Sequence, residues 1–406
     1  MIQYVLVAGV AAVVTGVLTW PIIRLSKRFH LAPEVRDRDV HTAPTPRLGG
    51  VAILAGVLAA FAVAVPTGAF TLAFDEHGGV AAVIGAAVMI VAVGVLDDLF
   101  DLDWTLKLAA QLGAALLLAW QGVQLLSLPI GGRVIGAPWI GVLVTVLAVV
   151  ITMNAVNFID GLDGLVAGVA IIANLAFLTY SHLLAERTER AGETSLAALI
   201  SSALVGACAG FLIWNWRPAK IFMGDSGSML VGLLMATSTI AVTGQVDAAS
   251  LGPNDLVPAL IPVLLPVAIL FLPLLDLALA VWRRLRAGRS PFAADRQHLH
   301  HRLMDLGHPH LRAVLVFYAW TVLLCGTMLS VFVFADPDWA WLILIFGGLA
   351  CSVFTVWPVL VRRINRYLNR GTASVSQLEE VAALGRAAAA ASATETTTSK
   401  ESRDEH

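Results

Sequence analysis

The chain has 406 residues, of which 58% are hydrophobic and only 13% are charged, and its mean hydropathy is +0.82. Because a soluble protein of this length carries about twice that charged fraction, composition excludes a soluble globular protein and indicates a polytopic membrane protein. The net charge of −2 says little, because the charge is unevenly distributed, and we expect no nucleic-acid partner.

The apolar stretch 2–23 is longer than a signal-peptide core and follows no basic segment, so we expect a first transmembrane helix there. A membrane-spanning helix needs about 20 apolar residues. By that rule the chain is an all-α protein with eleven transmembrane helices, over 2–23, 48–65, 79–96, 105–121, 137–156, 162–181, 195–215, 228–244, 256–281, 313–334 and 339–361.

The C-terminal segment 371–406 is rich in Ala, Thr, Ser and charge. We predict a largely disordered tail, with helix only near 375–391. Residues 1–370 would then form a single transmembrane domain, with its active site in the cytoplasmic loops. The three cysteines all lie in apolar runs, where we expect small core residues.

Lysine and arginine are concentrated in alternate loops. Of the 26 in the chain, an eleven-helix topology places 23 on one side and three on the other. Because cytoplasmic loops carry the excess of positive charge, we predict an external N-terminus and a cytoplasmic C-terminus.

Four polar motifs fall on the predicted cytoplasmic side, and the external loops hold no comparable cluster. Ionisable groups at membrane depth are generally functional. We therefore predict one cytoplasm-facing site, built from residues 97–101, 154–163, 224–228 and 295–301.

The first motif is a group of carboxylates at the end of the third predicted helix. Asp97 and Asp101 are four residues apart, and Asp98 and Asp101 are three apart. Residues at these spacings share one face of a helix, and a divalent cation would stabilise carboxylates placed so close together. The alternative is an acidic cap on a solvated helix end.

The second motif repeats its polar residues. Asn154 and Asn157 are three apart, as are Asp160 and Asp163, and a glycine follows each aspartate. Glycine lets the backbone approach a ligand closely. A helix-capping turn, the alternative, explains one Asp-Gly pair but not two.

The third motif places Asp225 just before a predicted helix. A carboxylate there is a hard oxygen ligand, suited to Mg²⁺ that also carries phosphate oxygens. The alternative is that Ser226 or Ser228 merely caps the helix.

The fourth motif combines three histidines with arginine. Zinc ranks low as its ligand, because no cysteine or tightly spaced carboxylate completes a tetrahedral set. A cationic cluster that binds a diphosphate or sugar fits better. A basic loop attracted to anionic lipid is the alternative, but it does not require histidines. The residues are Arg296, His298, His300 and His301.

Together these parts suit transfer of a phosphorylated group from a soluble nucleotide to a lipid phosphate. Mg²⁺ would offset charge on the diphosphate, and an aspartate would position or deprotonate the acceptor.

The sequence also resembles the polyprenyl-phosphate N-acetylhexosamine-1-phosphate transferase superfamily over about residues 20–305. Members transfer an N-acetylhexosamine phosphate from a UDP-sugar to a polyprenyl phosphate with Mg²⁺, or with Mn²⁺ as an alternative. The matching motifs are Pro44-Thr-Pro-Arg47-Leu-Gly49-Gly50, Asp97-Asp98 with Asp101, Asn154-x-x-Asn157-x-x-Asp160-Gly-Leu-Asp163-Gly, Asn215-x-x-Pro218 followed by Phe222-Met-Gly-Asp225-x-Gly-Ser, and His298-x-His300-His301.

The resemblance implies roles for these residues. Asp225 is the expected Mg²⁺ ligand, with Asp98 as a second. Asp97 and Asp98 would activate the acceptor, with Asp163 and His298 as further catalytic residues. Whether transfer is one step or passes through an aspartyl-phosphate stays open. The expected substrate-binding residues are Arg47, Lys107, Asn154, Asn157, Asp160, Asn215, Phe222 (stacking on the base), Arg296, His300 and His301.

Three features point to the branch that uses decaprenyl or undecaprenyl phosphate and N-acetylglucosamine. The peptidoglycan branch has a His-His-x-Glu pattern, whereas no Glu follows the histidines here, and Asp101 and eleven helices also suit the other branch. One departure is Arg38-Asp39 in place of the usual Arg-Lys before His41, which puts a role for a basic residue there in doubt.

The implied protein is a multi-pass bacterial plasma-membrane enzyme that uses UDP-GlcNAc in the first membrane step of a cell-envelope polysaccharide: lipopolysaccharide, arabinogalactan or teichoic acid. Family members are often homodimers. A second reading is the same chemistry with another UDP-sugar, such as UDP-MurNAc-pentapeptide. A third is an ion-coupled secondary transporter, but transporters favour midplane sites and internal repeats, whereas these carboxylates cluster at one interface.

Overall fold

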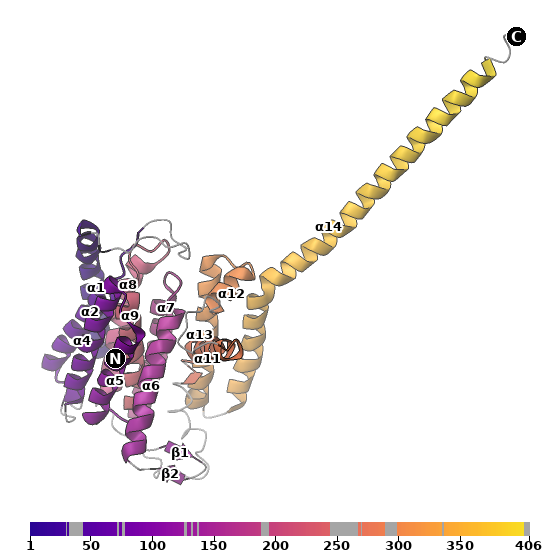
Figure 1. Cartoon of the computed structure of the whole chain (residues 1–406). Coiled ribbons are helices and arrows are strands. Elements are labelled where there is room, and N and C mark those ends of the chain that lie inside the picture. The colour runs from indigo at the N-terminus through magenta and orange to yellow at the C-terminus, as the bar shows by residue number, and fades with distance from the viewer. Residues whose placement is uncertain are drawn as a thin grey trace. The chain divides into compact units, whose positions relative to one another are not determined.

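A computed structural model of the chain is almost entirely helical in the residues it describes, which confirms the predicted all-α membrane protein (Figure 1). These residues are 1–29, 31, 44–70, 73–74, 78–125, 128–130, 133–135, 138–187, 195–243, 267–268, 270–288, 299–334 and 337–401.

Among the described residues, the helices follow one another with one short hairpin between them, in which strands β1 and β2 pair antiparallel. In chain order the elements are α1 (Ile2–Arg28), α2 (Gly49–Ala64), η1 (Val65–Thr67), α4 (Gly79–Phe100), α5 (Trp104–Trp120), β1 (Leu128–Ile130), β2 (Arg133–Ile135), α6 (Pro138–Ile159), α7 (Leu165–Arg187), α8 (Leu196–Asn215), α9 (Gly224–Thr243), α11 (Phe271–Arg286), α12 (Leu299–Asp305), α13 (His310–Phe334) and α14 (Pro337–Glu401).

Within the described ranges, nine helices are long and apolar enough to cross a membrane. They are α1, α2 with η1, α4, α6, α7, α8, α9, α13 and the first part of α14, and each coincides with a predicted span. The predicted span 105–121 corresponds to α5, a shorter apolar helix of 17 residues. The predicted span 256–281 lies partly outside the described residues, and α11 holds its described end. The count of eleven and the orientation of the termini stay predictions.

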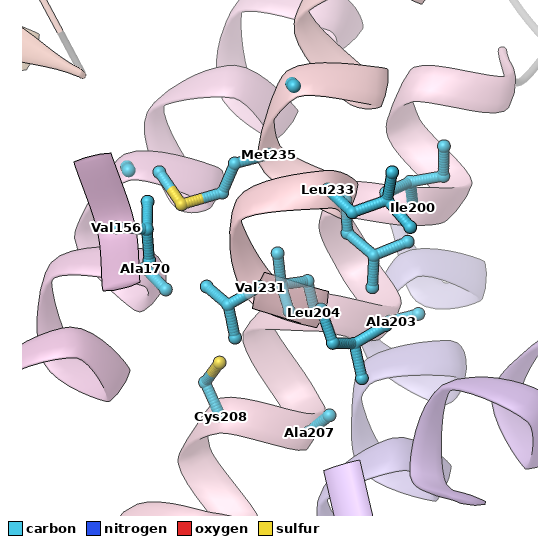
Figure 2. Close-up of a cluster of buried hydrophobic side chains, with 14 of the residues drawn as sticks. Val156, Ala170, Ile200, Ala203, Leu204, Ala207, Cys208, Val231, Leu233 and Met235 are labelled. Carbon is cyan, nitrogen blue, oxygen red and sulfur yellow. The ribbon is translucent and has the colours of Figure 1, made fainter. Parts of the chain in front are cut away.

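Most residues of helices α8 and α9 are buried, a larger share than in any other candidate span of the described chain. Their apolar side chains pack on one another and on α6 and α7. Leu204, Val231 and Met235 belong with Val156 and Ala170 to one cluster of buried hydrophobic side chains (Figure 2). Cys208 lies in the same cluster, as expected for a small core residue. These two helices therefore form the core around which the described helices are arranged.

The first helix packs closely on α8. An added Cβ at Gly206 would lie 1.9 Å from the carbonyl oxygen of Ala8, which no real contact allows. The Trp214 indole donates a hydrogen bond of 2.8 Å to the carbonyl oxygen of Gly16. Small residues that let helix backbones approach are typical of membrane-protein interfaces, where water does not drive association.

The C-terminal segment is helical over most of its length. Compactness divides the chain into Met1–Ser352 and Val353–His406, and the domain boundary near 370 with a disordered tail after it stays a prediction. The second unit continues α14 to Glu401, where the sequence predicts helix only near 375–391. The physical reason is helix propensity, because this segment contains the alanine run 387–391 among Glu, Leu and Arg residues.

We predict that Gly206→Ala destabilises the protein by about 1–3 kcal/mol, because a methyl group there overpacks the α1–α8 interface. The measurement is thermal unfolding of the detergent-solubilised protein. Gly9→Ala on α1 is the matched control, since an added Cβ at Gly9 meets nothing within 4 Å. Equal unfolding temperatures for the two variants would contradict the interface.

Candidate active site

The end of α4 meets the start of α9, and Asp98 makes the junction. Its Oδ1 accepts the backbone N–H of Asp225 at 3.0 Å. Its Oδ2 accepts the backbone N–H and the hydroxyl of Ser226, at 3.2 and 2.9 Å. The first N–H groups of a helix have no partner within the helix, so Asp98 supplies the cap from another helix.

This cap explains why α9 begins at Gly224 and not near residue 228 as predicted. Neither Ser226 nor Ser228 caps the helix with its own hydroxyl. Ser226 donates to Asp98, and Ser228 lies close to Asn157 Oδ1 at 2.6 Å and to the Gly224 carbonyl at 2.9 Å. The negative charge of Asp98 also suits the positive end of the helix dipole.

Glycine is required where α9 begins. Gly224 has a φ of +71°, in the left-handed region, and an added Cβ would lie 2.0 Å from the Arg47 carbonyl oxygen and 2.5 Å from Asp98 Oδ2. Gly94 on α4 is just as confined, since its Cβ would lie 2.3 Å from the Ser226 Cα. The Gly-Asp-Ser-Gly-Ser run is therefore a close-packing motif as well as a source of a carboxylate.

Lys107 on α5 lies between two carboxylates. Its ammonium group is 3.1 Å from Asp97 Oδ2 and 3.2 Å from Asp225 Oδ2. The other Asp97 oxygen accepts the backbone N–H of Leu102 at 2.9 Å. Asp225 is the more accessible of the two acids, with 28% of its side chain exposed against 7% for Asp97.

The Pro-Arg-Leu-Gly-Gly segment runs beside the segment that leads into α9. Phe222 donates its N–H to the Pro46 carbonyl at 2.8 Å, and Gly49 donates to the Phe222 carbonyl at 3.1 Å. These bonds bring Arg47 to the acidic site, where its charge acts on Asp160.

The paired asparagines lie on the last turns of α6. Asn154 donates to Gln111 Oε1 at 2.7 Å, and Gln111 in turn contacts the Met229 sulfur. Asn157 accepts the Ser228 hydroxyl. Both asparagines thus join α6 to the helices that carry Lys107 and Asp225.

Asp160 follows the end of α6. Burial raises the pKa of its carboxyl to about 8, with further contributions from the negative charges of Asp225 and Asp98. Within the part of the chain that the structure describes, no hydrogen bond reaches this carboxylate. A recessed carboxylate of this kind is suited to receive a donor group or a cation.

Asp163 and Asn215 are buried and bond to neighbouring backbone. Asp163 Oδ2 accepts the N–H of Ala219 at 3.2 Å. Asn215 accepts the N–H of Gly164 at 2.9 Å and donates to the Ile221 carbonyl at 2.9 Å. The structure thus gives both residues a bracing role, while the catalytic role predicted for Asp163 and the base-binding role predicted for Asn215 stay predictions.

The histidine motif is only partly described. Arg296 and His298 lie outside the described residues, as does the side chain of His300. His301 is half-buried on α12. The first residue of α12, Leu299, donates its N–H at 2.8 Å to the fully buried carboxylate of Asp276 on α11.

Four residues near these motifs were missed by sequence reasoning. Asp276 carried a usable signal, because a carboxylate inside an apolar run is a functional candidate. Gln111 and Tyr318 lie in predicted spans and His310 lies in the predicted loop before the span 313–334, and their spacing marked nothing unusual. They are Gln111, Asp276, His310 and Tyr318.

The carboxylates of this site fit a magnesium ion whose coordination shell is completed by substrate. Among the described residues, no three His, Cys, Asp or Glu side chains form a metal-binding group. Magnesium, however, is usually held by one or two carboxylates, several waters and substrate phosphates. Asp225 suits that mode, because its carboxylate is partly exposed. Asp98 suits it less, because three donors already engage its oxygens.

Comparison with known proteins agrees with this architecture. The model of "Glycosyl transferase family 4" matches residues 80–243. A decaprenyl-phosphate N-acetylglucosaminephosphotransferase of Mycobacterium leprae is 40% identical over 367 residues, covering 89% of this chain and 92% of the relative.

More distant relatives include a probable undecaprenyl-phosphate N-acetylglucosaminyl 1-phosphate transferase of Bacillus subtilis, 31% identical over 77% of this chain and 81% of the relative. An undecaprenyl-phosphate alpha-N-acetylglucosaminyl 1-phosphate transferase of Escherichia coli K12 is 29% identical over 86% of this chain and 90% of the relative.

The chain is therefore a multi-pass membrane enzyme that belongs to glycosyl transferase family 4. Within that family it groups with the polyprenyl-phosphate N-acetylglucosamine-1-phosphate transferases, which confirms the resemblance drawn from its motifs.

We predict that Lys107→Met destabilises the metal-free protein by about 1–3 kcal/mol, because two neighbouring carboxylates lose a charged hydrogen-bond donor. Added Mg²⁺ should then restore more stability to this variant than it adds to the wild type. Thermal unfolding in EDTA and in Mg²⁺ measures both effects.

The control for that experiment is Lys220→Met, whose ammonium group lies 5.3 Å from the Trp214 ring centroid. It removes the same charge without touching the acidic pair. The Lys107 ammonium group would lie where Mg²⁺ binds between the carboxylates. If Mg²⁺ stabilises Lys107→Met and the wild type equally, that interpretation is wrong.

Proposed function

We propose that the protein transfers N-acetylglucosamine 1-phosphate from UDP-GlcNAc to a polyprenyl phosphate. The observation that carries the proposal is the junction of α4, α5 and α9, where Lys107 bridges Asp97 and Asp225 and where Asp98 caps α9. The names of the relatives, which specify N-acetylglucosamine and decaprenyl or undecaprenyl phosphate, support the two substrates.

The reaction exchanges one phosphorus–oxygen bond for another. An oxygen of the polyprenyl phosphate attacks the phosphorus that bears N-acetylglucosamine. The bond from that phosphorus to the bridging oxygen breaks, and UMP leaves with this oxygen. The products are polyprenyl-diphosphate-GlcNAc and UMP, and catalysis of such a displacement consists mainly of positioning and charge stabilisation.

Asp225 would hold Mg²⁺, which when bound offsets charge on the diphosphate. Asp98 keeps the Asp225 backbone in place by capping α9, so it fixes the position of the Asp225 carboxylate. Lys107 lies close enough to both acids to reach a phosphate oxygen once a ligand enters. Arg47 adds a second positive charge, which acts on Asp160.

The contacts of the acidic pair favour a direct displacement over an aspartyl-phosphate. Three donors engage the Asp98 carboxylate. The two oxygens of Asp97 accept from Leu102 and Lys107. A carboxylate whose oxygens are held by donors is a weak nucleophile, so we infer that these groups orient and stabilise the reactants.

The positive-inside asymmetry of 23 lysines and arginines against three supports a cytoplasmic site in a bacterial plasma membrane. The product would then begin a cell-envelope polysaccharide, since a lipid diphosphate-sugar is a substrate for further glycosyl transfer on that face. Mn²⁺ would replace Mg²⁺ in the same ligand set, and dimerisation stays a prediction.

Release of UMP by the purified protein tests the proposal. With Mg²⁺, undecaprenyl phosphate and a panel of UDP-sugars, we expect release with UDP-GlcNAc and little with UDP-MurNAc-pentapeptide. Release with only another UDP-sugar would keep the chemistry and correct the donor. If protein shown to be folded released no UMP with any sugar, the proposal would be wrong and an ion-coupled transporter would be favoured.

We predict that Asp225→Asn lowers the rate of UMP release by about 100-fold or more, because even partners outside a metal's ligand shell are worth 10- to 100-fold. The concentration of Mg²⁺ that gives half-maximal rate should also rise. Asp103→Asn is the matched control, since Asp103 is exposed and caps α5 by accepting from Thr105, which Asn also does. A normal rate for Asp225→Asn at low Mg²⁺ would exclude the role.

A further inference from the structure

The turn that carries Asp160 is anchored by a helix outside all four sequence motifs. We propose that His310 and Tyr318, on α13, are positioning residues that hold this turn and thereby aim the Asp160 carboxylate at the sugar-nucleotide side of the site. The sugar nucleotide as ligand rests on the proposed function, whereas the anchoring of the turn by α13 does not.

Two contacts connect α13 to consecutive residues of the turn. Asp163 donates its backbone N–H to His310 Nε2 at 3.2 Å. The Tyr318 hydroxyl donates to the carbonyl oxygen of Gly164. His310 is buried, with 7% of its surface exposed, so water cannot readily replace it as the acceptor.

The Asp163–Gly164 peptide is consequently held from several sides. Gly164 also donates to Asn215 at 2.9 Å, and the Asp163 carboxylate accepts from Ala219 at 3.2 Å. Gly164 has a φ of +77°, a conformation that favours glycine. Four partners thus fix a two-residue stretch that begins three residues after Asp160.

The start of α7 is also shaped to accept the tyrosine. An added Cβ at Gly168 would lie 1.9 Å from the Tyr318 oxygen, so only glycine permits the ring to lie there. Gly168 thus makes room for the hydrogen bond between the Tyr318 hydroxyl and the Gly164 carbonyl. Apolar packing alone would not require a glycine there.

Asp160 itself has the opposite character. No hydrogen bond reaches its carboxylate from the described residues, although Asp98, Asp225 and Arg47 all act on it electrostatically. A turn fixed at one end with an unbonded carboxylate at the other is the arrangement of a preorganised binding group. Rigidity supplied by α13 then lowers the entropy lost when the ligand binds.

The acceptor role also sets the chemistry of His310. Nε2 must be unprotonated to accept the Asp163 N–H, so the proton of the neutral ring lies on Nδ1. Glutamine can present an acceptor oxygen in a similar place, whereas leucine cannot. This difference separates positioning from simple filling of space.

Hydrogen–deuterium exchange of the full-length, ligand-free protein in detergent gives the first test. We expect His310→Leu and Tyr318→Phe to accelerate exchange of the Asp163 and Gly164 amides by about 5-fold, the equivalent of one hydrogen bond. His310→Gln should restore slow exchange. Tyr180→Phe is the matched control, since Tyr180 is a buried tyrosine on α7 that packs edge-on against Phe332 of α13.

UMP release gives the second test, on the same variants. We expect the KM for UDP-GlcNAc to rise about 5-fold in His310→Leu and Tyr318→Phe, with kcat changed less and with His310→Gln near the wild type. If His310→Leu fails to fold, Tyr318→Phe decides alone.

Unchanged exchange at residues 163–164 would overturn the proposal. Faster exchange with unchanged kinetic constants would also overturn it, because the contacts would then be structural only. A wild-type protein that releases no UMP would refute the proposed function instead, and the exchange experiment would still decide whether α13 holds the turn.

Discussion

The hydrogen bonds between Asp98 and the first turn of α9 are the interaction on which the site depends. They join the end of one membrane helix to the beginning of another, so the Asp225 carboxylate has a fixed place relative to Asp97 and Lys107. The glycines around this point are a consequence, because backbone can approach backbone only where no Cβ intervenes. The negative charge of Asp98, the dipole of α9 and the close packing of the glycines thus all fix the junction between α4 and α9.

Buried polar groups in the rest of the described bundle follow the same logic. Asn154 with Gln111, Asn157 with Ser228, and Asn215 with Gly164 each join two segments that are distant in sequence. Inside a membrane such groups need partners, since no water is present to satisfy them. These partners hold the segments that surround the carboxylates of the candidate site.

Most of the long helices and several residues of the candidate site could be predicted from the sequence. The other contacts could not, for physical reasons. Apolar length located the long helices, and the spacing of Asp97, Asp98, Asp160 and Asp225 identified residues that lie near one another. Spacing could not show that Asp163 and Asn215 also bond to neighbouring backbone, and the substrate-side roles expected for both stay predictions. His310 and Tyr318 were invisible because their partners are backbone atoms, which leave no trace in side-chain patterns.

The pairing of α1 with α8 has a consequence for how the chain is made. The Trp214 indole and its acceptor carbonyl on Gly16 are 198 residues apart. Helix α1 is therefore synthesised long before α8, its principal partner. Until α8 is inserted, α1 must lie in the lipid beside other helices. Closing so long a loop makes assembly a late and slow event. The core of the protein is thus completed only when α8 and α9 are inserted, and Asp225 on α9 then reaches Asp98 and Lys107.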